Sequence, residues 1–237
     1  MPKTIIRTVG NSIDRLSGDI ERRYRIWTGR WLQGLSLMGE WYGRLINLPH
    51  TLALKPLHPN QQAYQAGKFV GMTLHQLMVC NEKAHDQQET ALCVFLDTVG
   101  VFNNTSFDSM CAALAKHGVD HTIIRWIRAT LEGRLATATL GRFSKSIGVS
   151  RGCPQEDVLS PLLWCLVVDQ LIARLNGGGF YTQGYADDIC LPVVGKFPNT
   201  VSGLTQWALH TVEMWCDELR LSVNPDKTGL VAFTRRR

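Results

Sequence analysis

The sequence predicts an α+β fold, in which helices stack behind one face of a largely antiparallel β-sheet. Residues 180–194 contain two short apolar and β-branched runs on either side of Asp187 and Asp188, a pattern typical of two strands joined by a tight turn. Residues 91–96 form a continuous apolar run, which is typical of a buried strand. Residues 200–219 repeat apolar side chains at helical spacing. With 237 residues, 45% of them hydrophobic, the chain is expected to be globular.

The first 55 residues are basic and carry three tryptophans. Ser12 is a suitable cap for a helix over residues 12–26. Arginines interleaved with aromatic residues suit either a nucleic-acid strand or a solvated basic arm, and both alternatives stay open. A second helix is predicted over residues 73–85, where four side chains share one face: Leu74, Leu77, Met78 and Asn81.

The middle of the chain predicts two capped helices. Thr105 or Ser106 caps a helix that stops at Gly118, and Asp120 caps another that runs to about Glu132. Apolar runs bounded by turn residues predict further strands at residues 135–140, 144–149, 221–223 and 230–234.

A loop at residues 152–157 leads into a nearly all-apolar segment, residues 158–169. Because apolar side chains lie on all sides of this segment, it predicts a helix buried on most of its surface.

Composition limits the setting and the partners. A formal net charge of +5 and a pI of about 8.9 are compatible with a polyanionic partner. Seven cysteines occur without a Cys-x-x-Cys pair, which favours a reduced, intracellular location in the cytoplasm or nucleus. The first residues lack the apolar core of a signal peptide and the apolar runs are interrupted, so we expect no membrane association. The oligomeric state does not follow from the sequence.

Three carboxylates are the candidate functional residues. Asp187 and Asp188 are adjacent at a hairpin tip, where two like charges are unfavourable unless a cation lies there. A solvated Asp-Asp turn is the alternative. Asp97 ends a buried strand, where a carboxylate is costly without a cation or donors. If this strand lies beside the hairpin, the three acids converge and are able to share two divalent ions about 4 Å apart, as in polymerases and nucleases.

Four motifs occur in the order found in reverse transcriptases, and a fifth segment adds to them. The motifs are Phe95-Leu96-Asp97 with Val101-Phe102, Pro154-Gln155 with residues 158–164, Tyr185-Ala186-Asp187-Asp188, and residues 221–228. The chain resembles most closely the enzymes of non-LTR (LINE-type), jockey-like retrotransposons, over about residues 56–235. Residues 57–67 are similar to the fingers segment of that family.

This resemblance implies a polymerase palm-type antiparallel sheet backed by helices, with partial fingers and no complete thumb. It divides the chain into a basic region at 1–55 and a fingers-palm domain at 56–237, with fingers at about 56–90 and 118–150 and palm at about 91–117 and 151–237. The implied activity is RNA-directed DNA polymerase, with two Mg2+ ions (or Mn2+), and the implied partners are an RNA template, a DNA primer and dNTPs.

The resemblance also implies roles for single residues. Asp97, Asp187 and Asp188 match the metal-binding aspartates, and Val99 matches the residue whose main-chain carbonyl binds one ion. Three further residues match nucleotide-binding positions: Phe102 under the incoming sugar, Gln155 beside the nascent base pair, and Lys227 where pyrophosphate departs. Each of the three has an alternative role: Phe102 as a core side chain, Gln155 as a capping side chain and Lys227 as a solvated surface lysine.

Departures from the family pattern define a second hypothesis. Glu156 and Asp157 replace glycines after Pro-Gln and place two acids beside the path of the nucleic acid and triphosphate. Asn103 stands where many relatives have a second aspartate, and the chain stops at Arg237, before a thumb. The chain is therefore expected to be a truncated retrotransposon fragment, either active or a catalytically inactive nucleic-acid-binding remnant. A third reading is an α+β domain with chance motif matches.

Overall fold

The computed structural model describes residues 56–65, 67–140, 142–154 and 159–233. The chain divides into two compact units, and the larger one comprises residues 51–134 and 148–237. In the smaller unit the described residues form a hairpin of β2 (Leu135–Leu140) and β3 (Phe143–Gly148). Both strands confirm the sequence prediction to within one residue. The predicted helix at 12–26, like the whole region 1–55, lies outside the described residues.

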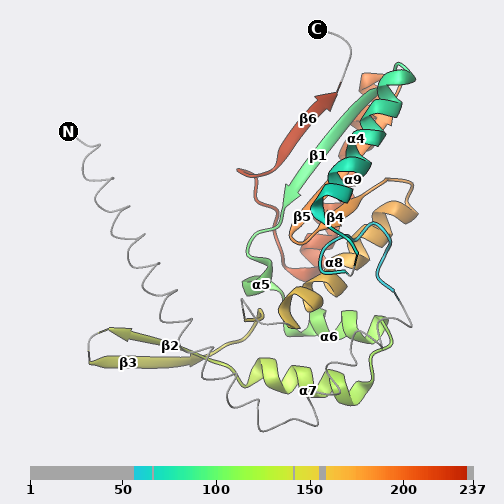
Figure 1. The fold of residues 1–237 in the computed structure, drawn as a ribbon. Helices are drawn as coiled ribbons and strands as arrows, with labels where there is room; N and C mark the ends of the chain where they lie inside the picture. The colour runs from blue at the N-terminus through green and yellow to red at the C-terminus, as the bar shows by residue number, and fades with distance from the viewer. Residues whose placement is uncertain (1–55, 66, 141, 155–158, 234–237) are drawn as a thin grey trace, which may run out of the picture. The chain divides into compact units, whose positions relative to one another are not determined.

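The larger unit is built on a four-stranded antiparallel sheet (Figure 1). Its strands are β1 (Thr90–Asp97), β4 (Gln183–Tyr185), β5 (Asp188–Gly195) and β6 (Gly229–Phe233), in the order β4-β5-β1-β6. β1 pairs with β5 along its whole length on one side, and residues 91–95 pair with β6 on the other. This central place explains why β1 is a continuous apolar run, and it confirms the predicted buried strand.

Two helices cover one face of this sheet: α8 (Leu159–Gly177) and α9 (Pro198–Leu219). A Cβ added to Gly184 of β4 would lie 2.7 Å from Ile172 of α8, and one added to Gly195 of β5 would lie 3.1 Å from Val201 of α9. The two helices meet through the rings of Trp164 and Trp215, edge to face at 6.4 Å. This is the arrangement of helices behind one face that the sequence predicts.

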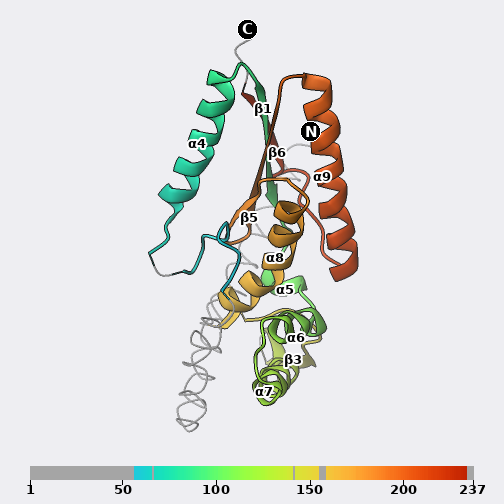
Figure 2. The ribbon, with the colours of Figure 1, turned by 90° about the vertical axis from the view of Figure 1, so that its right-hand side faces the viewer.

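The helix α4 (Val70–Asp86) lies against the opposite face (Figure 2). Its Leu77 packs with Cys93 of β1 and Cys190 of β5, which point away from α8 and α9. Of the four side chains predicted to share one face, Leu77 and Asn81 are buried, whereas Leu74 and Met78 are 55% and 54% exposed. The buried positions are Thr73, Leu77, Asn81 and Ala84.

Three helices follow β1 along the chain: α5 (Val101–Asn104), α6 (Phe107–Lys116) and α7 (His121–Glu132). The predicted caps of α6 and α7 are confirmed, since Ser106 accepts from the Ser109 N–H at 3.0 Å and Asp120 from the Thr122 N–H at 2.8 Å. α6 packs against α7 and α8. The single turn α5 has no sequence signal, and it places Phe102 just after the end of β1.

The helix α8 is longer than predicted, running past Asp169 to Gly177. Within the described part of the chain it is the one helix long and apolar enough, by length and composition alone, to cross a membrane. A core helix of a folded protein has the same composition. In this fold Leu163, Leu166 and Leu171 of α8 are almost completely buried.

Candidate functional site

The ends of two strands bring two of the predicted carboxylates together. Asp97 is the last residue of β1 and Asp188 is the first of β5, and the antiparallel register sets them directly opposite each other. Opposite residues in such a pair have Cα atoms about 4.5–5.5 Å apart and side chains on the same face. That face is the one that carries Cys93 and Cys190, opposite to α8 and α9. Neighbouring strands thus converge as the sequence analysis expected.

The third carboxylate lies in the turn between β4 and β5. Tyr185 and Asp188 close the hairpin, so the turn consists of Ala186 and Asp187. Ala186 adopts a left-handed φ of +58°, which a two-residue hairpin turn requires. The indole N–H of Trp164 donates to the Ala186 carbonyl oxygen at 2.8 Å and fixes this turn to α8. The packed helix therefore positions the aspartates.

Electrostatic repulsion is visible at the site. Partial burial raises the pKa of Asp188, and the neighbouring charges of Asp187 and Asp97 raise it further, whereas Lys227 lowers it. No group of three or more His, Cys, Asp or Glu side chains in the described residues is already arranged to hold a metal ion. The donor set nevertheless fits a hard divalent cation, because carboxylate oxygens are the ligands such cations prefer and a cation would relieve the repulsion.

Lys227 also reaches this site, as the resemblance implies. Its Nζ lies 3.4 Å from Oδ2 of Asp97. Lys227 belongs to the turn that follows Val223, and this turn is bound to the end of β1, because the Asn224 N–H donates to the Asp97 carbonyl oxygen at 2.8 Å. The predicted strand at residues 221–223 is reduced to a single bridge between Thr98 and Val223.

Two more predicted residues lie directly after β1. Val99 is exposed, and its carbonyl oxygen accepts a hydrogen bond from Asn104 Nδ2 at 3.2 Å. Phe102 is half-buried in α5, and its carbonyl oxygen accepts from the Cys153 N–H at 2.6 Å. Cys153 comes shortly before Gln155 in the chain, so the loop that carries Gln155 starts beside Phe102. Gln155, Glu156 and Asp157 themselves lie outside the described residues.

The segment before α4 runs along the outer edge of β4. Gly184 donates its N–H to Asn60 at 3.0 Å and accepts from the Gln62 N–H at 2.9 Å, and Gln61 forms a parallel bridge with Gly184. The exposed Tyr64 follows. Its pKa is raised by partial burial of the hydroxyl, and to a smaller degree by the charges of Cys165 and Asp187.

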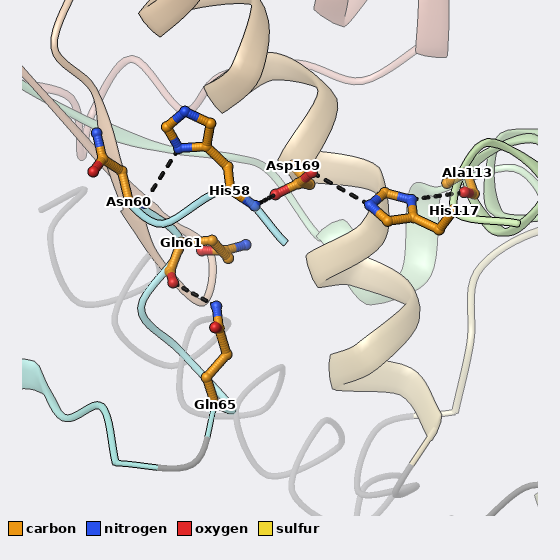
Figure 3. Close-up of polar contacts among 7 residues, drawn as sticks. All are labelled: His58, Asn60, Gln61, Gln65, Ala113, His117 and Asp169. Atoms are coloured by element: carbon orange, nitrogen blue, oxygen red, sulfur yellow. Dashed lines mark hydrogen bonds and ion pairs between the residues drawn. The ribbon is translucent and has the colours of Figure 1, made fainter. Parts of the chain in front are cut away.

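The sequence analysis missed a buried polar network behind the site (Figure 3). Asp169 of α8 accepts from the His58 N–H at 2.7 Å through Oδ1, and its Oδ2 lies 3.4 Å from Nε2 of His117. His117 Nδ1 donates to the Ala113 carbonyl oxygen at 3.0 Å, since a carbonyl only accepts. A buried acid in the apolar helix was the available signal, because such an acid needs a partner.

Comparison with known proteins gives a consistent result. Residues 38–235 match the family described as reverse transcriptase (RNA-dependent DNA polymerase). The chain is 30% identical over 149 residues to the retrovirus-related Pol polyprotein of the type-1 retrotransposable element R2 from Popillia japonica, which covers 57% of this chain. It is 24% identical over 198 residues to the probable RNA-directed DNA polymerase from transposon X-element of Drosophila melanogaster, which covers 82% of this chain. The chain spans 21% of the length of each of these relatives.

Solved structures share the fold at low sequence identity. The telomerase from Candida Tropicalis in complex with a TWJ fragment of telomeric RNA has a TM-score of 0.61 and 8% identity over 80% of this chain and 33% of its own. The corresponding complex from Candida albicans has a TM-score of 0.59 and 12% identity over 79% of this chain and 33% of its own. These likenesses concern the fold alone.

Proposed function

Because this chain belongs to the reverse transcriptase (RNA-dependent DNA polymerase) family, we propose that it is the part of a non-LTR retrotransposon polymerase that joins nucleotides on an RNA template. The observation that carries the proposal is the register that sets Asp97 opposite Asp188, beside the turn that holds Asp187. Asp97 is thus brought from a distant part of the chain to the end of the sheet that carries the adjacent Asp187 and Asp188. Members of this family use divalent metal ions.

In the proposed mechanism these carboxylates would hold two Mg2+ ions, or Mn2+, which would activate the primer 3′-hydroxyl and neutralise the triphosphate. The protein's own residues orient the reactants. Trp164 keeps the aspartate turn in place through its bond to Ala186. Phe102 closes the sugar site and obstructs a 2′-hydroxyl, Gln155 contacts the nascent base pair, and Lys227 donates toward the departing pyrophosphate.

The finer identity of the partners belongs to the same proposal. We propose an RNA template, a DNA primer and dNTPs as substrates, which the basic charge of the chain would attract. We also propose an intracellular location, which the seven cysteines without a Cys-x-x-Cys pair support.

A primer-extension assay on an RNA template tests the function. The chain is compared with Asp187→Ala and with Asp86→Ala, a matched control for an exposed acid at the end of α4. We expect Asp187→Ala to lose extension by at least about a hundredfold, and Asp86→Ala to keep it. Equal extension by the chain and by Asp187→Ala would refute the assigned role.

The catalytically inactive nucleic-acid-binding remnant is the second candidate, and Glu156 and Asp157 favour it. It predicts salt-sensitive retention of RNA or DNA without extension. The double variant Glu156→Gly with Asp157→Gly tests this candidate. Recovery of binding or synthesis would identify these acids as the defect, whereas no recovery would show that they are not.

A further inference from the structure

Asp97 already has a cation within reach. The ammonium of Lys227 lies 3.4 Å from its Oδ2 oxygen, and the side chains are 67% and 15% exposed for Lys227 and Asp97 respectively. The Asp97 carboxylate is thus mostly shielded from water. The Lys227 side chain contacts this carboxylate through its ammonium and is otherwise exposed to solvent. An ion pair of this kind forms and breaks easily.

The backbone delivers Lys227 to this position. The Asn224 N–H donates to the Asp97 carbonyl oxygen at 2.8 Å, and the Val99 N–H donates to the Ser222 carbonyl oxygen at 2.8 Å. Asn224 in turn closes the turn around Lys227, because its carbonyl oxygen accepts from Thr228 Oγ1 at 2.8 Å. The turn is therefore attached to the strand whose carboxylate its lysine neutralises, which keeps the ammonium at a high local concentration.

The segment between β1 and α5 carries the second expected ligand. The Val99 carbonyl oxygen, which the family resemblance assigns to a metal ion, accepts a hydrogen bond from Asn104 Nδ2 at 3.2 Å. The Asn104 amide sits against Gly100, where an added Cβ would lie 2.8 Å from Asn104 Nδ2. At the end of β1, Oδ2 of Asp97 is therefore paired with the Lys227 ammonium, and the Val99 carbonyl oxygen is hydrogen-bonded to Asn104.

A divalent cation and this ammonium exclude each other at Asp97. A cation bound to a carboxylate oxygen sits about 2.0–2.6 Å from it, and two positive charges on one oxygen repel strongly. We propose that Lys227 is an internal competitor of the divalent cation, so that metal binding at Asp97 displaces the Lys227 ammonium. This inference rests on the proposed function, because it concerns the same metal site.

Displacement gives Lys227 two positions. Without a divalent cation it neutralises Asp97 and opposes the repulsion among the aspartates. With a cation bound, its exposed side chain is released into the solvent in front of the site, where it is available to an anionic ligand such as a triphosphate. Occupation of the metal site would thus control when this lysine is available.

Binding of Mn2+ to the full chain, followed by the electron paramagnetic resonance signal of free Mn2+, tests the competition. For Lys227→Gln we expect affinity up to about fivefold higher than for the unchanged protein, the effect of removing one partly exposed ion pair. Lys227→Arg keeps the pair and should bind within about twofold of the unchanged protein. The matched charge control is Lys196→Gln. Lys196 follows the far end of β5, roughly 25 Å from Asp188 at 3.3 Å per residue.

The outcomes separate the two proposals. The competition is supported if Asp97→Asn loses Mn2+ binding and if Lys227→Gln, but not Lys196→Gln, binds Mn2+ more tightly. Unchanged or weaker binding in Lys227→Gln, or equal tightening in Lys196→Gln, overturns the competition while leaving the metal site intact. Undiminished binding in Asp97→Asn overturns the proposed metal site itself.

A second measurement uses the unchanged protein. The 13Cε resonance of Lys227 should move on titration with Mg2+ in step with binding, whereas that of Lys196 should stay in place. A Lys227 resonance that does not move while the site saturates would overturn the competition, even if Lys227→Gln fails to fold.

Discussion

At the scale of single residues, mutual repulsion of Asp97, Asp187 and Asp188 distinguishes this end of the sheet. The pKa of Asp188 is raised above its ordinary value of 3.8 by burial and then by Asp187 and Asp97. A group whose pKa is raised on folding favours the folded state below its ordinary pKa and loses that contribution as the pH rises through the raised value. At neutral pH, without a divalent cation, Asp188 therefore opposes folding.

Replacement of Asp188 by Asn should consequently stabilise the protein in the presence of EDTA. We expect the melting temperature to rise by up to about 3 °C at pH 7, an upper limit because the side chain is exposed. The difference should disappear near pH 3, where both side chains are neutral. Thermal unfolding at the two pH values measures it. A melting temperature at pH 7 that is unchanged or lower would contradict the repulsion.

Gly152 is the residue that holds the loop before Gln155 against α5. Its φ is +77°, and a Cβ added there would lie 2.5 Å from the Phe102 carbonyl oxygen. Gly118 has the same φ of +77°, but an added Cβ meets nothing within 4 Å. Substitutions at these two glycines therefore distinguish the cost of backbone strain, which both share, from the cost of a steric clash, which arises only at Gly152.

We expect Gly118→Ala to lower the free energy of unfolding by about 1–2 kcal/mol, the cost of a left-handed residue with a Cβ. Gly152→Ala should cost at least about 1 kcal/mol more, because the added carbon meets backbone that cannot move aside without breaking hydrogen bonds. Urea unfolding of both variants provides the comparison. Equal costs would show that the close approach to Phe102 is not required.

At the scale of elements, the sheet determines how much of the apolar face of α4 is buried. Asn81 Oδ1 accepts from the thiol of Cys93 at 3.5 Å, and Leu77 packs on the same strand. The apolar residues Val70, Leu74 and Met78 stay exposed. The hydrophobic spacing therefore identified the helix and two of its inner residues, Leu77 and Asn81, but not the limits of the buried face.

This orientation makes a direct prediction about two leucines. Leu77→Ala should lower the free energy of unfolding by about 2–5 kcal/mol, as expected for a buried leucine, whereas Leu74→Ala should change it by less than about 0.5 kcal/mol. Urea unfolding distinguishes them. Equal or reversed costs would show that Leu77 is not the leucine through which α4 packs on the sheet.

At the scale of the whole molecule, Asp169 joins segments that are far apart in the sequence. Its two oxygens reach the backbone of His58 and the ring of His117, and so connect the segment beside β4 with α6 and α8. Since that segment is hydrogen-bonded to Gly184, close to the aspartate hairpin, the network supports the site from behind.

We expect Asp169→Ala to lower the free energy of unfolding by about 3–5 kcal/mol, because it removes the carboxylate beside the buried His117 ring and the acceptor of the part-buried His58 N–H. Asp217→Ala, at an exposed position of α9, is the control and should cost less than about 0.5 kcal/mol. Denaturant unfolding measures both. A cost for Asp169→Ala as small as that of the control would show that this network does not stabilise the molecule.

Local sequence patterns were sufficient for most of the elements and for the candidate residues, but not for α5 or for the extent of α8. The caps Ser106 and Asp120, the strand that ends in Asp97 and the hairpin that holds Asp187 all follow from short-range preferences of the backbone, and each is confirmed. The division into fingers and palm, and the roles of Val99, Phe102, Gln155 and Lys227, stay predictions. The order of the motifs was enough to indicate the family.

The sequence by itself determined which segments are strands or helices, which residues are acidic at the strand ends, and the family to which the chain belongs. Only the tertiary structure decided which apolar side chains of α4 are buried, the Asp169 network, the close approach at Gly152 and the pairing of Lys227 with Asp97. The physical reason is the distance along the sequence between the residues that interact. Caps, turns and strand propensity depend on neighbours within a few residues, whereas each of the other features depends on a partner that folding brings from elsewhere in the chain.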